Sequence, residues 1–227
     1  MGRVNYKVIL DQYKKNGKGN VRLTQSSLYL TKPISATQTS YNFDVLETQS
    51  ATLQANEIRL NLNDEFIVTQ LGFYLQASVS DGMGTSYGNV LLTTPPTQDA
   101  GATATLNNFY QGAFQIAVNN VIYLDKWDTA KHKFVPRTQY SDYYSTAGAS
   151  ARIDSVDFSR NSMYPVEPLI TLSGAKKNDL RLDLPTSITG ATFTIATNDG
   201  RSNVYVIDRV GILLRGLNAQ NGASFQQ

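Results

Sequence analysis

The chain has 227 residues, a length that fits one all-β sandwich or barrel and that buries a core without help from disulfides or metal. It contains no cysteine, which excludes disulfides, thiolate nucleophiles and cysteine-bound zinc. The formal net charge is only +2, but residues 1–22 hold six basic residues and one acid, against 14 basic and 17 acidic residues in the remainder. The positive charge is therefore concentrated at the amino terminus.

The leading segment, residues 1–22, is predicted to be a basic arm. Its cations are Arg3, Lys7, Lys14, Lys15, Lys18 and Arg22. This concentration indicates contact with a polyanion or an acidic neighbour, with a solvated terminus as the alternative. Residues 6–10 fit a short strand, and residues 14–20 fit a flexible loop because they contain two glycines and no apolar side chain. The apolar run at 8–10 is too short for a secretory signal, and no stretch has the ~18 apolar residues of a membrane helix.

The strongest strand signal lies at residues 57–79. Every second residue from Ile58 to Leu62 is apolar, and the alternation resumes after a polar turn at 63–65. Period-two alternation places every second side chain on one face of a strand. We therefore predict a long β pair joined at this turn, with a bulge near Gly72, where the parity breaks.

Shorter strand-like segments lie on both sides of this pair, at residues 21–24, 27–30, 41–45, 153–158, 169–172, 180–184 and 210–217, the last of which is predicted to close the sheet. Two hairpins are also predicted. One turns at Asn119-Asn120, unless residues 114–124 form one strand bulged at the two asparagines. The other turns at Asp199-Gly200, between two alternating runs.

Stretches rich in glycine, proline, serine or threonine at 80–88, 93–105 and 140–150 are predicted to be surface loops. No window of a dozen residues has helical periodicity, so the chain is predicted to be all-β. The long irregular connections favour a single jelly-roll-like antiparallel β-sandwich over an up-and-down barrel. We expect a sandwich domain at residues 23–217 between the extended amino-terminal arm and a polar tail at 218–227.

Few side chains suit catalysis or metal binding. The single histidine, His132, lies between two lysines, which would oppose its protonation as a general base, and its segment is predicted to be a solvated turn. One histidine and no cysteine leave only oxygen ligands for a metal, and turn formation explains the asparagine and acidic clusters at 61–65 and 198–200. No catalytic residue, metal site or cofactor is predicted.

Trp127 lies between Asp125 and Asp128. Two acids beside an exposed indole would suit a glycosidase or a sugar-binding site, but a tryptophan that anchors the edge of a sandwich is the favoured interpretation. A tyrosine-rich segment offers a contact loop, because tyrosine supplies area and a polar tip; its residues are Tyr140, Tyr143 and Tyr144. The basic residues lie on no patterned recognition element, so only non-specific phosphate contact by the arm is indicated.

These features together resemble the β-sandwich structural proteins of bacteriophage and other icosahedral virions. The resemblance lies in the basic arm, the short alternating strands, the long Thr/Ser/Asn/Gly/Gln-rich loops, the absence of cysteine and the polar tail. The segments that carry it are residues 58–75, IRLNLNDEFIVTQLGFYL, and 109–127, FYQGAFQIAVNNVIYLDKW. The chain is too short for the two sandwiches of double jelly-roll capsid proteins, which favours one sandwich.

The resemblance implies a capsid or capsid-associated protein without enzymatic activity, assembled in the host cytoplasm into a virion. Its partners would be its own copies and other virion proteins, with the arm reaching a neighbouring subunit or packaged nucleic acid. The alternative is a carbohydrate-binding or adhesion module of a phage fibre, which would bind a glycan through Trp127 and the tyrosine-rich loop. An enzymatic role of Asp125 and Asp128 is the third interpretation.

Overall fold

The computed structural model describes residues 6–18, 20–47, 57–81, 83–92, 100–133, 162–196 and 202–223. Its strands are β1 (Arg22–Pro33), β2 (Ser40–Phe43), β3 (Glu65–Asp81), β4 (Ser86–Leu92), β5 (Ala113–Val118), β6 (Val121–Asp128), β7 (Tyr164–Ser173), β8 (Asn178–Asp183), β9 (Ala191–Ala196) and β10 (Ser202–Gln220). Its helices are α1 (Tyr6–Lys15), α2 (Ala100–Phe109) and the 3-10 turn η2 (Thr129–His132). The described residues form no helix with the length and apolar character needed to cross a membrane.

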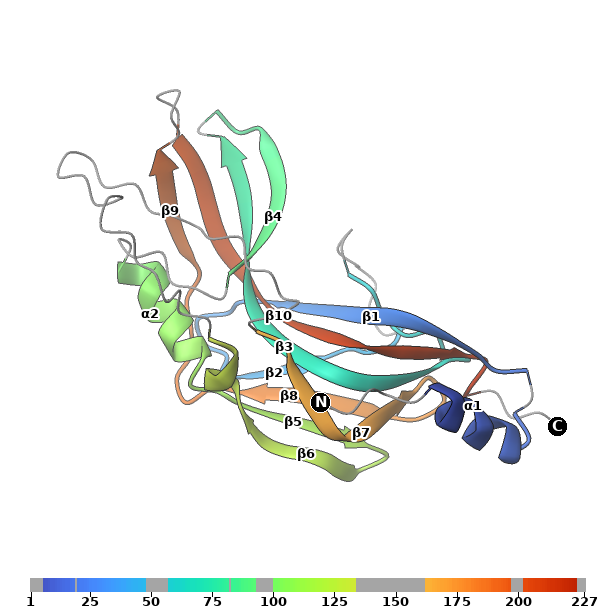
Figure 1. Ribbon diagram of the computed structural model, residues 1–227. Coiled ribbons are helices and arrows are strands. Elements are labelled where there is room, and N and C mark those ends of the chain that lie inside the picture. Colours follow the sequence, from blue (N-terminus) through green and yellow to red (C-terminus); the bar gives the residue numbers. More distant parts are fainter. Residues whose placement is uncertain are drawn as a thin grey trace.

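The strands form two antiparallel sheets, as the all-β prediction requires. Sheet A has the order β1-β10-β3-β4, with β7 also paired to β3 and β9 to β10, and sheet B has the order β2-β8-β5-β6. The sheets pack face to face along most of their length (Figure 1). At one end, β4, β9 and the adjoining ends of β3 and β10 project beyond the sandwich (Figure 1).

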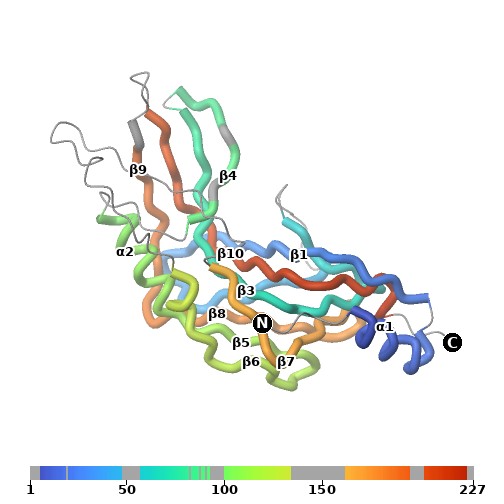
Figure 2. The backbone as a smooth tube through the Cα atoms, in the orientation of Figure 1, coloured from blue at the N-terminus to red at the C-terminus, as the bar shows by residue number. Residues whose placement is uncertain are grey.

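The long strands β3 and β10 run side by side through the centre of sheet A (Figure 2). Their register extends from Glu65 opposite Ala219 to Asp81 opposite Asn203. The register shifts at Thr69, which has no partner, so the predicted bulge exists but lies three residues before Gly72. The prediction that residues 210–217 close the sheet is wrong, because this part of β10 lies between β1 and β3.

The predicted β pair joined at residues 63–65 is also wrong. Residues 57–60 do not pair with β3; Ile58 bridges Tyr29 of β1, and Leu60 bridges Leu46 after β2. Residues 57–60 thus lie between β1, at the edge of sheet A, and the chain just after β2 of sheet B. The predicted buried face is wrong as well: of Ile58, Leu60 and Leu62 only Leu60 is buried, whereas Ile58 and Leu62 are 49% and 48% exposed. Alternation carries no information about the partner strand.

The Asn119-Asn120 hairpin is confirmed. β5 and β6 pair up to Val118 opposite Val121, and both asparagines have positive φ, 50° and 63°, as a type I′ turn requires. The alternating segment before Pro185 forms β8, and β9 pairs with β10 as predicted. The turn that joins β9 to β10 lies outside the described residues.

The core lies between the inner faces of the two sheets. Phe73 of β3 and Phe114 of β5 meet edge to face, with ring centroids 4.9 Å apart. α2 covers one end of this core with Ala102, Leu106 and Phe109, all fully buried. The prediction of a surface loop at 93–105 is therefore wrong from Ala100 onward.

A buried ionic cluster holds residues 57–60 against sheet A. The Glu57 side chain is 0% exposed and accepts hydrogen bonds from Thr31 N (3.0 Å) and from Arg59 Nη2 (3.2 Å). Arg209 Nη2 lies 3.9 Å from the same carboxylate. Arg59 is itself only 3% exposed, and its other carboxylate partner, Asp44 Oδ2, lies 3.8 Å from Nη1. Loss of Glu57 would therefore leave a desolvated cation with only this longer ion pair.

We expect Glu57→Ala to lower the free energy of unfolding by roughly 3–5 kcal/mol in urea titrations, because it breaks a buried ion pair. The matched control is Asp183→Ala, which breaks a pair with Arg181 whose side chains are 43% and 47% exposed. Such an exposed pair contributes at most about 1 kcal/mol. If both variants lost the same free energy of unfolding, the ion pair at Glu57 would not be desolvated.

Candidate functional site

Residues 6–15 of the basic leading segment form a helix packed on the sandwich, which corrects the strand predicted at residues 6–10 and the extended conformation predicted for this part of the arm. In α1, Ile9 and Tyr13 lie one helical turn apart and are buried against Ile67, Leu217 and Ala219 on the outer face of sheet A. Residues four apart share one face of a helix, so both side chains reach the sheet. The helix thereby covers apolar surface at one end of β3 and β10.

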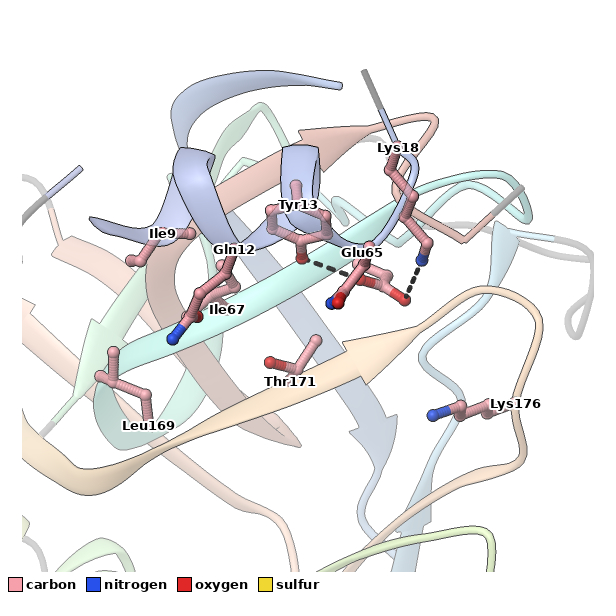
Figure 3. Close-up of a pocket in the computed structure, with 10 residues that line it drawn as sticks. Ile9, Gln12, Tyr13, Lys18, Glu65, Ile67, Leu169, Thr171 and Lys176 are labelled. Carbon is pink, nitrogen blue, oxygen red and sulfur yellow. Dashed lines mark hydrogen bonds and ion pairs between the residues drawn. The ribbon is translucent and has the colours of Figure 1, made fainter. Parts of the chain in front are cut away.

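Glu65, the first residue of β3, connects this helix to the sheet. Its Oε2 accepts a hydrogen bond from the Tyr13 hydroxyl at 2.8 Å, and its Oε1 lies 3.3 Å from Lys18 Nζ (Figure 3). Lys18 Nζ also donates to the carbonyl of Gly222. Burial, followed by the neighbouring Glu65, raises the pKa of Tyr13 above its ordinary value, so the hydroxyl stays a donor. Lys18 is consequently a structural residue of this junction.

The opposite face of α1 is basic. Lys7, Lys14 and Lys15 are exposed together with Asp11, and at 100° per residue they lie on the side away from Ile9 and Tyr13. Arg22 is exposed at the start of β1, and Arg3 lies outside the described residues. The structure thus holds three of the six predicted contact residues on one fixed surface, which we call the basic face: Lys7, Lys14 and Lys15.

Grooves flank α1 on both sides. One of about 390 Å³ separates the helix from β7, with Gln12, Glu65, Thr171 and Lys176 among its lining residues (Figure 3). Another, of about 460 Å³, lies between the helix and the start of β1; most of its lining residues are apolar or aromatic, and Lys7 and Arg22 also line it. Within the described part of the chain, no three His, Cys, Asp or Glu side chains are grouped so as to hold a metal ion.

His132 is fully buried, so the predicted solvated turn is wrong. Trp127 Nε1 donates to His132 Nε2 at 2.8 Å, which fixes Nε2 as the unprotonated nitrogen because an indole N–H can only donate. Nδ1 therefore carries the proton and donates to the Ser162 carbonyl at 2.7 Å. The rings of Phe73 and Tyr164 pack edge-on against the imidazole. The ring serves as a neutral link inside the fold.

The residues proposed for a sugar site are engaged in local structure. Trp127 packs against the core, as the edge-anchor interpretation predicted, and Lys131 Nζ lies 4.4 Å from its ring centroid. Asp125 accepts from Gln115 Nε2 at 3.2 Å, and Asp128 accepts from Ala130 N at 2.8 Å at the start of η2. The loop residues Tyr140, Tyr143 and Tyr144 lie outside the described residues.

One surface was not singled out from the sequence. Val121, Ile122 and Tyr123 of β6 are 56%, 54% and 52% exposed, and β6 is an edge of sheet B. The sequence signal for this surface is a run of three large apolar residues directly after a turn. Strict alternation would place only every second residue of such a run in the core. We call these residues the β6 triplet.

Comparisons with protein-family models, with curated protein sequences and with solved structures gave no match. The candidate surfaces are therefore assessed on their geometry. Two are built from described residues, namely the basic face of α1 and the β6 triplet.

If α1 is docked on the sheet, substitutions at the neighbouring residues Ile9 and Val8 should have different effects on its proteolysis. Ile9→Asp places a charge in the buried contact and should release the helix, whereas Val8→Asp changes a side chain that is 52% exposed. In Ile9→Asp, the loss of roughly 2 kcal/mol of apolar contact corresponds to about thirtyfold faster tryptic cleavage at Lys14 and Lys15. Cleavage at equal rates in both variants would contradict the docked helix.

The chain has a single histidine, and burial, the largest cause, lowers the pKa of His132 from its ordinary 6.5 to about 4. The unfolded chain then binds the proton first, so stability is fully present above pH 6.5 and is lost as the pH falls toward 4. We expect the free energy of unfolding of the protein to fall by roughly 3 kcal/mol more than that of His132→Gln across this range. The variant keeps an acceptor for Trp127 and does not titrate. Parallel pH profiles of the two proteins would contradict the buried neutral ring.

Proposed function

We propose that the protein is a virion structural protein, a capsid or capsid-associated component built on a single jelly roll. The observation that carries the proposal is the nesting of the strand pairs. With β4 and β9 set aside as extensions of the central pair, eight strands remain. The first pairs with the last (β1 with β10), the second with the seventh (β2 with β8), the third with the sixth (β3 with β7) and the fourth with the fifth (β5 with β6).

Such nesting arises when one long antiparallel hairpin is rolled into two sheets. The two further pairs, β10 with β3 and β8 with β5, are the contacts that the rolling creates. The jelly roll has eight strands in two sheets and occurs in viral capsid proteins and in lectins. The strand pairing therefore supports both classes of protein, and the surfaces must distinguish between them.

The surfaces favour the virion role. The basic face of α1 is held on the body by Ile9, Tyr13 and Glu65, so its charges have fixed positions for a polyanion or for the acidic surface of a neighbour. The lectin alternative has less support, because Lys131 and His132 occupy the ring face and the N–H of Trp127 that a sugar would use. In the proposed role, the sandwich is the rigid shell unit and involves no catalysis or cofactor.

Assembly tests the proposal directly. The purified protein, expressed without a signal sequence, is expected to form particles of uniform size in negative-stain images and a single large species in light scattering. Salt, pH and protein concentration should be varied, because shell contacts are individually weak. A protein that remains monomeric under all these conditions would overturn the virion role.

The basic face predicts non-specific, salt-dependent binding of nucleic acid. With Lys7, Lys14, Lys15 and Arg22 in contact, the logarithm of the binding constant for a labelled single-stranded oligonucleotide should fall with the logarithm of salt concentration with a slope of about −3. Lys14→Gln with Lys15→Gln should flatten the slope by about 1.4. The matched control, Lys126→Gln with Lys131→Gln, removes the same charge from the β6 side and should leave the slope unchanged. Equal effects of the two pairs would show that only net charge matters.

A further inference from the structure

Two hollows follow β1 along the outer face of sheet A. The first is the groove of about 460 Å³ between α1 and residues 21–23, where the helix lies beside the start of the strand (Figure 1). The second, of about 300 Å³, is lined by residues 25–27 of β1 together with Ile58 and Arg215. The middle residues of these two stretches are four apart, which is about 13 Å along a strand. The hollows are therefore neighbours on one strand.

The alternation of β1 places both hollows on the same face of the sheet. Leu23 packs into the apolar cluster beneath α1, and Gln25 and Ser27 follow it at intervals of two, so their side chains share its face. Arg215 of β10 lies directly opposite Ser27, and side chains of directly opposite residues project on the same side of a sheet. The guanidinium therefore belongs to the same surface as α1.

This surface is positively charged. Two of its cations line the first hollow, one lines the second, and one follows Leu10 of the first hollow by a helical turn. These cations are Lys7, Arg22, Arg215 and Lys14. The chain has no acidic residue between Asp11 and Asp44, so neither β1 nor the connection from α1 to β1 opposes them.

The acids that adjoin this surface do not cancel its charge. Asp11 of α1 is outnumbered by the three lysines of the basic face. Glu65 lines the groove on the other side of α1 and is paired with Lys18. Glu57, which precedes Ile58 of the second hollow, is 0% exposed and paired with Arg59. The partner that this surface fits is therefore an anion.

The linings of the hollows fit nucleobases. In the first, Tyr6 is 49% exposed and lies among apolar side chains; an exposed aromatic ring beside cations is a stacking platform for a base. In the second, the amide and hydroxyl groups at 25–27 adjoin Ile58, which is 49% exposed, so a base would find both an apolar surface and hydrogen-bond partners. A duplex would offer only its phosphates, because its bases are paired inside the stack.

We propose that single-stranded nucleic acid binds along β1 on the outer face of sheet A, with bases in the two hollows and phosphates on the cations beside them. This inference names the partner of the basic face and rests on the proposed function, in which the protein encloses nucleic acid. Stacking accepts every base, so binding is selective for single strands and not for sequence.

Fluorescence anisotropy with a labelled oligothymidylate, and with a duplex of equal length, tests base binding by the full chain. The single strand should bind more tightly than the duplex. Tyr6→Leu should weaken single-strand binding roughly fivefold or more, through loss of one stacked base, and should leave the salt slope unchanged because it removes no charge. The matched control is Tyr123→Leu, which changes a ring of β6 that is 52% exposed and should not affect binding.

Three results would overturn base binding: equal affinities for single strand and duplex, equal affinities of the two tyrosine variants, or competition by poly-glutamate as effective as that by unlabelled oligothymidylate. The last result would identify an acidic protein surface as the partner, because poly-glutamate supplies charge without bases.

Salt dependence tests the path along β1. Arg215 lies outside the basic face, so Arg215→Gln should flatten the salt slope of single-strand binding by about 0.7, and Arg215→Lys should keep it. Arg181→Gln removes the same charge from sheet B, where the side chain is 47% exposed, and should leave the slope unchanged. A slope that Arg215→Gln does not alter, or that both glutamine variants alter equally, would overturn the path.

Failure of this inference can be told apart from failure of the virion role. Selective single-strand binding by a chain that forms no particles would refute the virion role and leave the inference standing. Particles built from a chain that binds single strand and duplex equally would refute the inference alone.

Discussion

The antiparallel pair of β3 and β10 is the contact on which the other elements depend. β1 and β9 pair with β10, and β4 and β7 pair with β3, so every other strand of sheet A is hydrogen-bonded to one of these two. At the bulge the two backbones approach so closely that a Cβ on Gly216 would lie 1.9 Å from the Ile67 carbonyl oxygen. The same pair also has apolar side chains on the face that points away from sheet B, and these must be covered: Ile67, Leu217 and Ala219. The helix covers them with Ile9 and Tyr13, and this packing fixes the position of its lysines.

The sequence predicted individual strands better than their partners. The β5–β6 hairpin was predictable because a two-residue turn of Asn119 and Asn120 sets the pairing locally. Ile58 and Leu60 alternate as clearly as any strand, yet each bridges a residue that is distant in the sequence. Alternation indicates an extended segment but not its partner, and here it did not identify the buried face either, because Leu60 is buried while Ile58 is 49% exposed. The nested order of the eight strands was therefore beyond residue-level patterns, although composition did indicate a sandwich.

Both helices and His132 were missed for physical reasons. The helical period of α2 is present in Ala102, Thr105, Leu106 and Phe109, but glycine and threonine have low helix propensity, so the segment resembles a loop. α1 has only two buried positions, which is too few for a periodicity signal. The lysines beside His132 suggested that the histidine is exposed to solvent, but a short 3-10 turn points the three side chains in different directions. Of the candidate site, the sequence therefore predicted the basic residues but not the surface on which they are held.

The treatment of the sheet edges connects the fold to assembly. β7 carries Pro165 and Pro168 and β6 carries bulges, while β1 is bridged by Ile58. Each device interrupts open-ended strand addition, which would otherwise join copies without limit. What remains for specific contact is side chains in fixed places: the basic face on the outer side of sheet A and the β6 triplet at an edge of sheet B. Because these surfaces belong to different sheets, one copy can use both at once, as the proposed virion role would require.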